Sequence, residues 1–243
     1  MSFVLIIGSK SDIGKAVARA FASEGYDLYL ASRDAGDDQE FAKDIQIRFG
    51  RQAKCIELDI LDYETHRSCY ETLDPRPAGV ITVVGYLGNQ DSAQADFSET
   101  EKIIDTNYTG IVSFLNVVAD DLESRGSGFI AGISSVSGDR GRKSNYIYGS
   151  SKAALSAYLS GLRNRLSSSN VKVLTVKPGF VNTRMTEGMD LPGALTVQPD
   201  DVAKAIIKAH KGNRNVIYVH WLWRWIMLLV RTIPEFIFKK TSI

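Results

Sequence analysis

The residues best suited to acid–base chemistry in this sequence are Tyr148 and Lys152, in the segment Tyr148-Gly-Ser-Ser-Lys152. A spacing of i and i+4 places both side chains on one face of a helix start. A free tyrosine has a pKa near ~10, and a neighbouring ammonium lowers it by favouring the phenolate. The pair therefore predicts a proton donor made acidic by Lys152. Tyr146 competes for this role, but Ser150 stands where its lysine would be, so we interpret Tyr146 as a pocket wall.

A hydroxyl and an amide near the ends of two predicted strands add to this pair. Ser135 follows the apolar run 128–133, and Asn107 lies in the helical pattern after the run 80–84. Carboxyl ends of parallel strands share one edge of an open α/β sheet, where ligands bind. We therefore expect Ser135 to polarise a carbonyl and Asn107 to have a polar role at the same edge.

The serines also raise the alternative of a hydrolase with Ser134 or Ser135 as nucleophile. Its segment Gly132-Ile-Ser-Ser-Val lacks the Gly-x-Ser-x-Gly elbow of that chemistry. The three histidines are scattered along the chain, which leaves no suitable base. Because of this scatter, and because the two cysteines have no zinc-like spacing, we also expect no metal site.

A glycine-rich turn, Gly8-Ser-Lys-Ser-Asp-Ile-Gly14, separates the apolar run 4–7 from the helical pattern 13–23. Glycine permits a tight turn and a close approach to a pyrophosphate. The following helix then directs its free N–H groups and positive dipole end at the anion. Two glycines alone are a weak signal, but the strand-then-helix setting predicts a nucleotide site.

The end of the second predicted strand, Leu30-Ala31-Ser32-Arg33, indicates which nucleotide binds. An acidic residue there would hydrogen-bond the ribose hydroxyls of NAD, whereas a cation favours the 2′-phosphate of NADP. Arg33 is a cation, and Lys10 can add a second charge. We expect NADP(H), with NAD(H) the less favoured cofactor; the alternative is that Arg33 is only a solvated surface residue.

Elements that position these residues alternate between strand and helix along the whole chain. This rhythm predicts a Rossmann-like, doubly wound parallel sheet of about seven strands with helices on both faces. The expected strands are 4–7, 28–31, 54–58, 80–84, 128–133, 171–176 and 216–219. The expected helices are 13–23, 41–49, 63–73, one long or two abutting helices over 99–123, 148–167 and 199–211.

Composition is that of an ordinary soluble globule, with 44% hydrophobic and 23% charged residues. The net charge of +1 argues against nucleic acid as a partner. The first residues, MSFVLIIGSK, lack the pattern of a signal peptide. We expect a cytoplasmic protein.

Taken together, these motifs resemble the short-chain dehydrogenase/reductase family over nearly the whole chain. The resemblance implies NAD(P)-dependent oxidoreductase activity on CH–OH/C=O groups, with Asn107, Ser135, Tyr148 and Lys152 as catalytic residues. It places Asp59-Ile60 at the adenine and Pro178-Gly179-Phe-Val-Asn-Thr183 at the nicotinamide. The expected cofactor-binding residues are Gly8, Lys10, Ser11, Asp12, Ile13, Gly14, Arg33, Asp59, Ile60, Gly85, Tyr148, Lys152, Pro178, Gly179, Val181 and Thr183.

Two positions depart from the family pattern. Asp12 replaces the middle glycine of the loop, and Thr82-Val83-Val84-Gly85 replaces the usual Asn-Asn-Ala-Gly. A carboxylate beside phosphates is electrostatically unfavourable, so we expect Asp12 to cap the following helix instead.

A narrower similarity is to the keto-reductase subunits of decaprenylphosphoryl-β-D-ribose 2′-epimerases. It runs through the glycine loop, Asn107-Tyr-Thr109, the segment 142–149 and the tail 225–234. It implies an NADPH-dependent reductase of a keto-sugar carried on polyprenyl phosphate. Tyr148 would give the proton, Ser135 would polarise the carbonyl, Asn107 would position a water, and 184–198 would form the substrate lid.

Other functions remain open at this stage: reduction of a small soluble ketone, or a non-catalytic NADP-binding scaffold. Epimerases and dehydratases of the longer relatives need a substrate domain for which too little chain remains after residue 180. The family resemblance further implies a homodimer or homotetramer.

The tail, 221–243, is rich in tryptophan, aliphatic residues and cations, and its apolar stretch is too short to span a bilayer. We divide the chain into a catalytic domain, 1–220, and this tail. Two interpretations fit the tail: a helix packed on its own domain or a sister subunit, or a peripheral contact with the inner face of the membrane.

Overall fold

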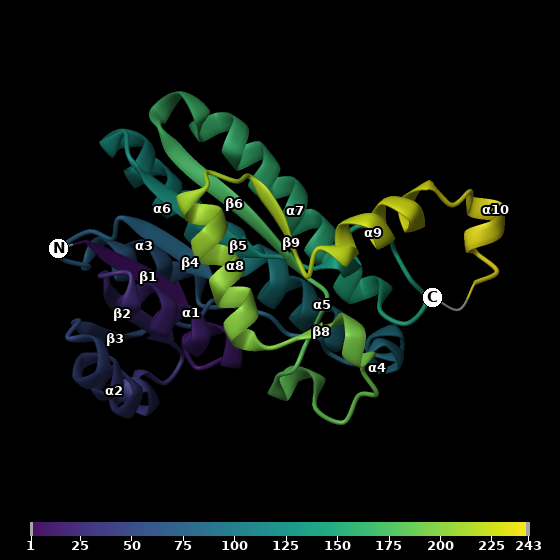
Figure 1. Cartoon of the computed structure of the whole chain (residues 1–243), viewed down its shortest axis with the longest axis horizontal. Helices are drawn as coiled ribbons and strands as arrows, with labels where there is room; N and C mark the ends of the chain where they lie inside the picture. The colour runs from purple at the N-terminus through teal and green to yellow at the C-terminus, as the bar shows by residue number, and fades with distance from the viewer. Residues whose placement is uncertain (1, 242–243) are drawn as a thin grey trace.

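Seven strands form one parallel sheet in the order β3-β2-β1-β4-β5-β6-β9 (Figure 1). The structure is a computed structural model, and it describes residues 2–241. The chain crosses over between β1 and β4, which creates the switch point where ligands bind in such sheets. The predicted Rossmann-like fold class is therefore confirmed. The strands are β1 Phe3–Ile7, β2 Asp27–Ser32, β3 Ala53–Glu57, β4 Gly79–Thr82, β5 Gly128–Ile133, β6 Val171–Pro178 and β9 Val216–Val219.

Helices cover both faces of this sheet. Helices α1, α2 and α8 pack against one face, and α3, α6 and α7 against the other. Strand β1 shows why its residues are all apolar: Val4 and Ile6 join the first core, whereas Leu5 and Ile7 join the second. The bounds of these helices are α1 Asp12–Ser23, α2 Gln39–Phe49, α3 His66–Glu71, α6 Gly110–Arg125, α7 Tyr146–Leu166 and α8 Pro199–Lys211.

The predicted helical stretch 99–123 is interrupted. Helix α5, Phe97–Ile104, passes into a π-helical turn, Asp105–Thr109, before α6 begins at Gly110. A π turn contains one extra residue per turn and is common at functional sites. Asn107 lies in this π turn and not in a regular α-helix, which corrects the prediction from the sequence.

Several short elements were not expected from the sequence. Helix α4, Gln90–Ala95, follows the β4 strand, and β7, Phe180–Val181, pairs in parallel with β8, Thr196–Val197. The segment between β7 and β8 contains 3₁₀ turns at Arg184–Thr186 and Gly193–Leu195. These elements are too short for periodicity to reveal them.

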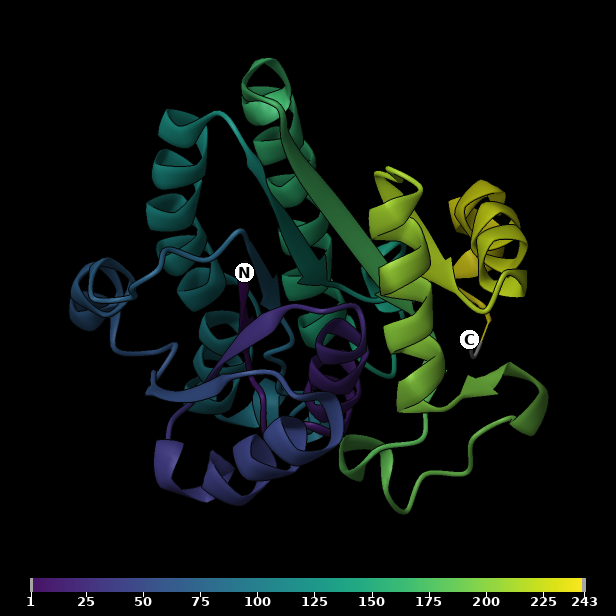
Figure 2. The same ribbon diagram turned by 60° about the vertical axis from the view of Figure 1, so that its left-hand side comes forward.

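The tail forms two helices, α9, Leu222–Thr232, and α10, Glu235–Phe238. One side of α9 packs on the body of the protein through Trp223, Met227 and Val230, which join Val136 in a small apolar cluster. In Figure 2 these helices (yellow) lie on the same side of the molecule as the 184–197 segment (green). Within residues 2–241, no helix has both the length and the apolar character that a bilayer crossing requires.

Candidate active site

A cavity of about 720 Å³ opens at the carboxyl ends of β4, β5 and β6. This is the edge at which the parallel topology directs ligand-binding side chains. Most of the residues predicted to act on the nicotinamide half of a cofactor line it together. They are Ile13, Gly85, Ser135, Tyr148, Lys152, Pro178, Gly179, Val181 and Thr183.

The first turns of α7 carry both members of the predicted proton-transfer pair. Lys152 is only 2% exposed, and its Nζ donates to the carbonyl of Ile133 at 3.2 Å. The same Nζ lies 5.8 Å from the centre of the Tyr148 ring. Tyr148 lies at the cavity wall within hydrogen-bonding reach of Ser135. The i, i+4 spacing therefore brings the two side chains to one cavity, as expected.

The acidity of this pair differs from the sequence prediction. Burial raises the pKa of Tyr148 to about 12, although the hydrogen bond with Ser135 opposes this rise. Burial also lowers the pKa of Lys152 to about 7. The expectation of an acidic tyrosine beside a full ammonium is therefore wrong for this structure, because removing both groups from water disfavours both of their charged forms. At neutral pH Tyr148 is a protonated phenol, ready to donate.

Asn107 is fully buried in the π turn, next to the cavity. Its Nδ2 donates to the carbonyls of Tyr86 at 2.6 Å and Ile103 at 2.8 Å, and its Oδ1 accepts from the Tyr86 N–H at 3.1 Å. Both amide hydrogens are used, so only Oδ1, which has a second lone pair, could meet a water, and the water-positioning role stays a prediction. Asn107 also ties the loop after β4 to the helix, which holds Gly85 against the site.

Ser134 and Ser135 have different surroundings. Ser134 Oγ donates to the carbonyl of Lys152 at 2.9 Å and also contacts Ser156 Oγ at 2.7 Å, which holds β5 against α7. Ser135 Oγ accepts from the Ser137 N–H at 3.1 Å and faces the cavity. Both serines line the cavity, but the Ser134 hydroxyl is committed to Lys152 and Ser156, whereas the Ser135 hydroxyl can still donate to a ligand.

The glycine loop has the backbone geometry that a pyrophosphate cradle needs. Gly8 has a φ of +88°, a left-handed conformation that favours glycine, and a Cβ on Gly14 would collide with the Gly8 carbonyl. Ser11 caps α1 by accepting from the Gly14 N–H at 3.0 Å. The residues therefore fit a dinucleotide phosphate at the helix N-terminus.

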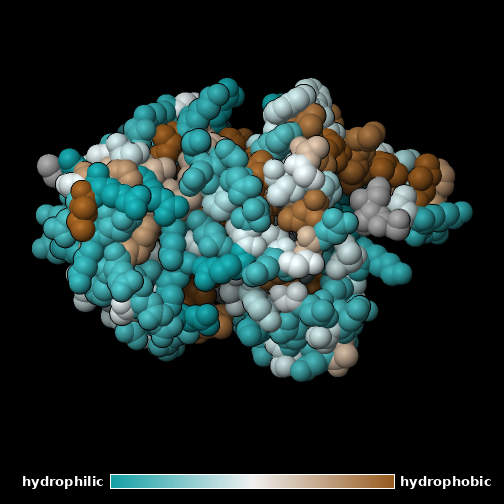
Figure 3. Space-filling view, turned by 60° about the horizontal axis from the view of Figure 1, so that its bottom comes forward, coloured by the Kyte–Doolittle hydropathy of each residue, from teal (hydrophilic) through white to brown (hydrophobic). Residues whose placement is uncertain are grey.

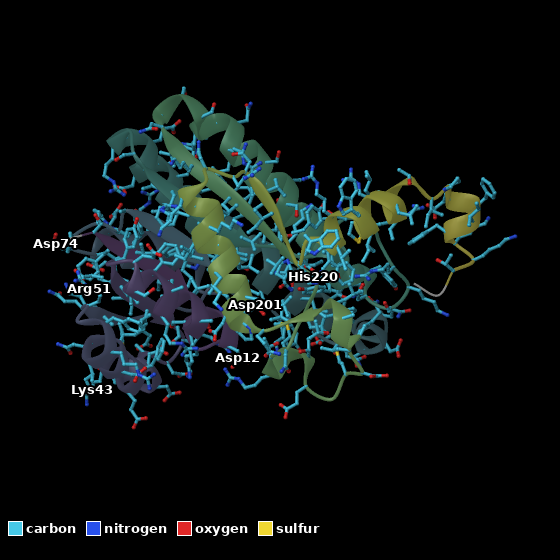
Figure 4. The ribbon with its side chains drawn as sticks, in the orientation of Figure 1. Asp12, Lys43, Arg51, Asp74, Asp201 and His220 are labelled. Carbon is cyan, nitrogen blue, oxygen red and sulfur yellow. The ribbon has the colours of Figure 1, made fainter. Side chains whose placement is uncertain are left out.

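The expected capping role of Asp12 is corrected, since Ser11 performs it. Asp12 Oδ2 instead accepts from the Arg184 backbone N–H at 2.8 Å, and its Oδ1 lies 3.3 Å from Arg184 Nε. Figure 4 shows Asp12 beside the 184–197 segment. The guanidinium offsets the carboxylate charge, which explains how an acid is accommodated in this loop.

The two cations predicted to read a 2′-phosphate have different partners. Arg33 is exposed and has no ion-pair partner among residues 2–241. Lys10 Nζ lies 2.5 Å from Asp37 and 3.5 Å from Asp34, and its hydrogen bond with Asp37 raises the Lys10 pKa. Arg33 is therefore available to an anion, whereas Lys10 must first leave Asp37.

Asp59 and Ile60, the residues predicted at the adenine, follow β3 and do not line the large cavity. Asp59 uses Oδ1 to accept from the Leu61 N–H at 3.0 Å, and the Ile60 carbonyl packs where a Cβ on Gly110 would stand. Sequence reasoning also missed Asp38, a buried carboxylate that accepts from Ser9 and Ser32, each at 2.7 Å. Asp38 lies in the acidic stretch 34–40, whose composition is typical of an exposed loop, so the sequence did not indicate its burial.

The substrate end of the cavity contains polar groups that the motifs did not reveal. Gln90 Oε1 accepts from the Ile147 N–H at 3.1 Å, which fixes α4 beside the start of α7. The cavity lining is thus partly polar and partly apolar. Polar lining residues include Asn89, Gln90, Asp91, Lys143, Ser144 and Asn145, and apolar ones include Leu87, Phe180, Met185 and Met189.

Comparison with known proteins supports the class of enzyme that this geometry indicates. The short-chain dehydrogenase family model matches residues 2–191, so the chain belongs to that family of oxidoreductases. An uncharacterized oxidoreductase of Mycobacterium tuberculosis is 34% identical over 240 residues, covering 98% of this chain and 96% of the relative. One from Streptomyces coelicolor is 31% identical over 243 residues, covering 98% and 94%.

Solved structures agree with this assignment. A short-chain dehydrogenase from Sphingobium yanoikuyae, in complex with NADPH, has a TM-score of 0.83 and 25% identity, with 97% of each chain covered. The bulky-bulky ketone specific alcohol dehydrogenase from Comamonas testosteroni has a TM-score of 0.82 at 22% identity, covering 97% of this chain and 96% of that one. The predictions of fold and of an NAD(P)-dependent oxidoreductase are therefore confirmed.

Proposed function

We propose that this oxidoreductase uses NADPH to reduce a ketone, with Tyr148 as the proton donor. The observation that carries the proposal is the meeting of Tyr148, Ser135 and Lys152 at one wall of the 720 Å³ cavity. The segment from Pro178 to Thr183 lines the same cavity, at the end of β6. A carbonyl placed between these groups would have a proton donor and a hydrogen-bond donor on the same side.

The cofactor would be held by the glycine loop at its phosphates and by Pro178, Val181 and Thr183 at its nicotinamide. When bound, the nicotinamide supplies the hydride. A preference for NADP(H) is supported by Arg33, which is free to pair with a 2′-phosphate. The NADPH complex of the Sphingobium relative agrees with this preference.

Proton transfer follows from the protonation states of Tyr148, at the cavity wall, and of the buried Lys152. Tyr148, with its pKa raised to about 12, holds its proton at neutral pH and can deliver it to the developing alkoxide. Ser135 has a single hydroxyl proton to donate, and it would donate it to the carbonyl oxygen on which negative charge develops. Lys152, with a pKa lowered to about 7, can take up a proton from solvent when negative charge forms on Tyr148, and its ammonium would then stabilise the phenolate. Asn107 keeps the surrounding backbone in place.

For the substrate we propose a keto-sugar attached to a polyprenyl phosphate. The polar residues of the cavity lining suit ring hydroxyls, and Lys143 among them is a cation for a phosphate. The apolar lining residues Phe180, Met185 and Met189 suit an apolar chain. The similarity of the glycine loop and tail to keto-reductase subunits of decaprenylphosphoryl-ribose epimerases supports the same choice. Reduction of a small soluble ketone is the second candidate, because the cavity volume also admits one.

The test is NADPH oxidation with a polyprenyl-phosphate keto-pentose and with a panel of small ketones. We expect turnover of the lipid-linked sugar at a kcat/KM at least roughly a hundredfold above that of the panel. Tyr148→Phe should abolish turnover and keep NADPH binding, whereas the control Tyr146→Phe should retain turnover. Residual activity of Tyr148→Phe near that of the wild type would refute the proton donor. Equal or better turnover of a small ketone would refute the substrate.

A further inference from the structure

Helix α9 has apolar residues on two sides, and only one of them is covered. The inner side packs on the body of the protein, where Trp223 meets Phe180 with ring centres 5.6 Å apart. The outer side is open, and together with α10 it forms what we call the tail surface. Its apolar members are Trp221 at 67% exposed, Trp225 at 57%, Leu228 at 54%, Leu229 at 67%, Phe236 at 66% and Ile237 at 46%.

These side chains form a continuous patch at helical spacing. The patch begins at Trp221, which immediately precedes α9, and continues with Trp225, Leu228 and Leu229 at i+4, i+7 and i+8. This spacing places all four side chains on one face of the helix. Figure 3 shows hydrophobic surface gathered over these helices, which project from the rest of the molecule in Figure 1. A projecting apolar face of this kind indicates a binding surface.

The charges around the patch are cationic. Arg224 and Arg231 lie along one edge of the exposed face of α9, and Lys239 and Lys240 follow α10, all of them exposed. The one acidic residue of this stretch, Glu235, is already paired with Arg140 at 2.9 Å. The chain as a whole has a net charge of only +1, so this excess is local.

We propose that the tail surface binds the surface of a membrane that contains anionic phospholipids. Tryptophans and aliphatic side chains would enter the interfacial region, and the surrounding cations would meet lipid phosphates. A second copy of the chain is disfavoured as occupant, since a two-fold contact would set these same cations against each other. Helix α9, Leu222–Thr232, would lie in the membrane plane, because its length is about half of what a bilayer crossing requires.

The position of the tail gives this contact a consequence for the active site. The inner side of α9 packs against Phe180 and against Gly179, where a Cβ would collide with the Trp223 ring. Both Gly179 and Phe180 line the cavity. A membrane bound on the outer side of α9 would therefore lie one helix away from the catalytic cavity.

The experiment uses the full chain with NADPH and vesicles of phosphatidylcholine, with or without phosphatidylglycerol. All three tryptophans of the chain belong to the tail, and two are exposed, so intrinsic fluorescence reports directly on this surface. We expect sedimentation with the anionic vesicles and a blue shift of the emission. Trp225→Ser/Leu229→Ser should bind roughly tenfold or more weakly. Arg224→Glu/Lys240→Glu should lose roughly tenfold or more on anionic vesicles only.

The matched control is Ile47→Ser/Phe97→Ser, which removes two apolar side chains that are 83% and 74% exposed elsewhere on the molecule. It should bind vesicles like the wild type. Unchanged binding by Trp225→Ser/Leu229→Ser would overturn the proposal. The proposal would also be overturned if the wild type formed a dimer and did not bind vesicles, while Trp225→Ser/Leu229→Ser was a monomer. A second copy of the chain would then be the partner that covers the tail surface. NADPH affinity serves as the folding check for every variant.

Discussion

Arg184 pairs with Asp12 and so joins the glycine loop to the segment between β7 and β8; we call this contact the clasp. The Arg184 backbone N–H and its Nε both contact the Asp12 carboxylate, at 2.8 and 3.3 Å, and its guanidinium also donates to the Lys10 carbonyl at 2.6 Å. Asp12 therefore anchors the segment that carries Met185 and Met189 over the cavity.

This clasp predicts a coupled effect of two substitutions on NADPH binding. Arg184→Ala should weaken binding by up to about fivefold, because it leaves the Asp12 carboxylate unpaired beside the phosphate loop. Asp12→Asn alone should change binding little. The double variant should recover most of the loss, since no uncompensated charge remains. Fluorescence titration of NADPH over the four proteins measures this cycle. An equal loss in Arg184→Ala and the double variant would instead mean that Arg184 acts on the cofactor directly.

Much of this fold and site could be predicted from the sequence because it depends on local signals. Buried parallel strands are apolar runs, and the i, i+4 pair of Tyr148 and Lys152 is visible in the sequence. The clasp could not be predicted, since Asp12 and Arg184 meet only through the tertiary fold. The prediction of a lowered Tyr148 pKa was wrong, because the i, i+4 spacing reveals the neighbouring lysine but not the burial that shifts the pKa of both groups. Likewise, the π turn around Asn107 has no periodic signature.

Burial of Lys152 predicts how stability depends on pH. Its pKa falls from 10.5 to about 7 on folding, so between these values the unfolded chain binds one more proton than the folded chain. Stability should therefore rise with pH across this window, and Lys152 should destabilise the protein most near or below pH 7. Lys152→Met should be more stable than the wild type by a few kcal/mol at about pH 6, and the difference should shrink as the pH approaches 10.

Urea unfolding of the two proteins between about pH 6 and pH 9.5 checks this prediction. The range stays below the ordinary tyrosine pKa of 10.0, above which the raised pKa of Tyr148 gives a slope of opposite sign. A constant difference between the proteins over this range would show that Lys152 keeps its ordinary pKa on folding.

Pairing of Lys10 with Asp37 predicts that cofactor preference can be shifted in both directions. Asp37→Asn removes the nearer partner, 2.5 Å from Lys10, and leaves only Asp34 at 3.5 Å, so Lys10 can turn to a 2′-phosphate more readily and the ratio of kcat/KM for NADPH over NADH should increase several-fold. Arg33→Ala should decrease that ratio by roughly tenfold, because a 2′-phosphate would lose its available cation. Lys43→Ala, an exposed cation on α2, is the control and should leave the ratio unchanged. A ratio unaffected by Arg33→Ala would remove the argument for NADP(H).

Arg140 fastens the tail to the body of the protein. It donates to the carbonyls of Val230 and Ile233, each at 2.6 Å, and its guanidinium lies 3.7 Å from the centre of the Phe238 ring. Arg140→Met should therefore undock α9 and α10, so that limited proteolysis within 221–241 becomes roughly tenfold faster while hydrogen exchange in the sheet stays unchanged. Because α9 supports Phe180 in the cavity wall, the KM for the ketone should rise without a change in NADPH affinity. The control Arg67→Met loses only the exposed ion pair with Glu71 and should be cleaved at the wild-type rate. If Arg140→Met and Arg67→Met were cleaved equally fast, the packing of Trp223 alone would hold the tail in place.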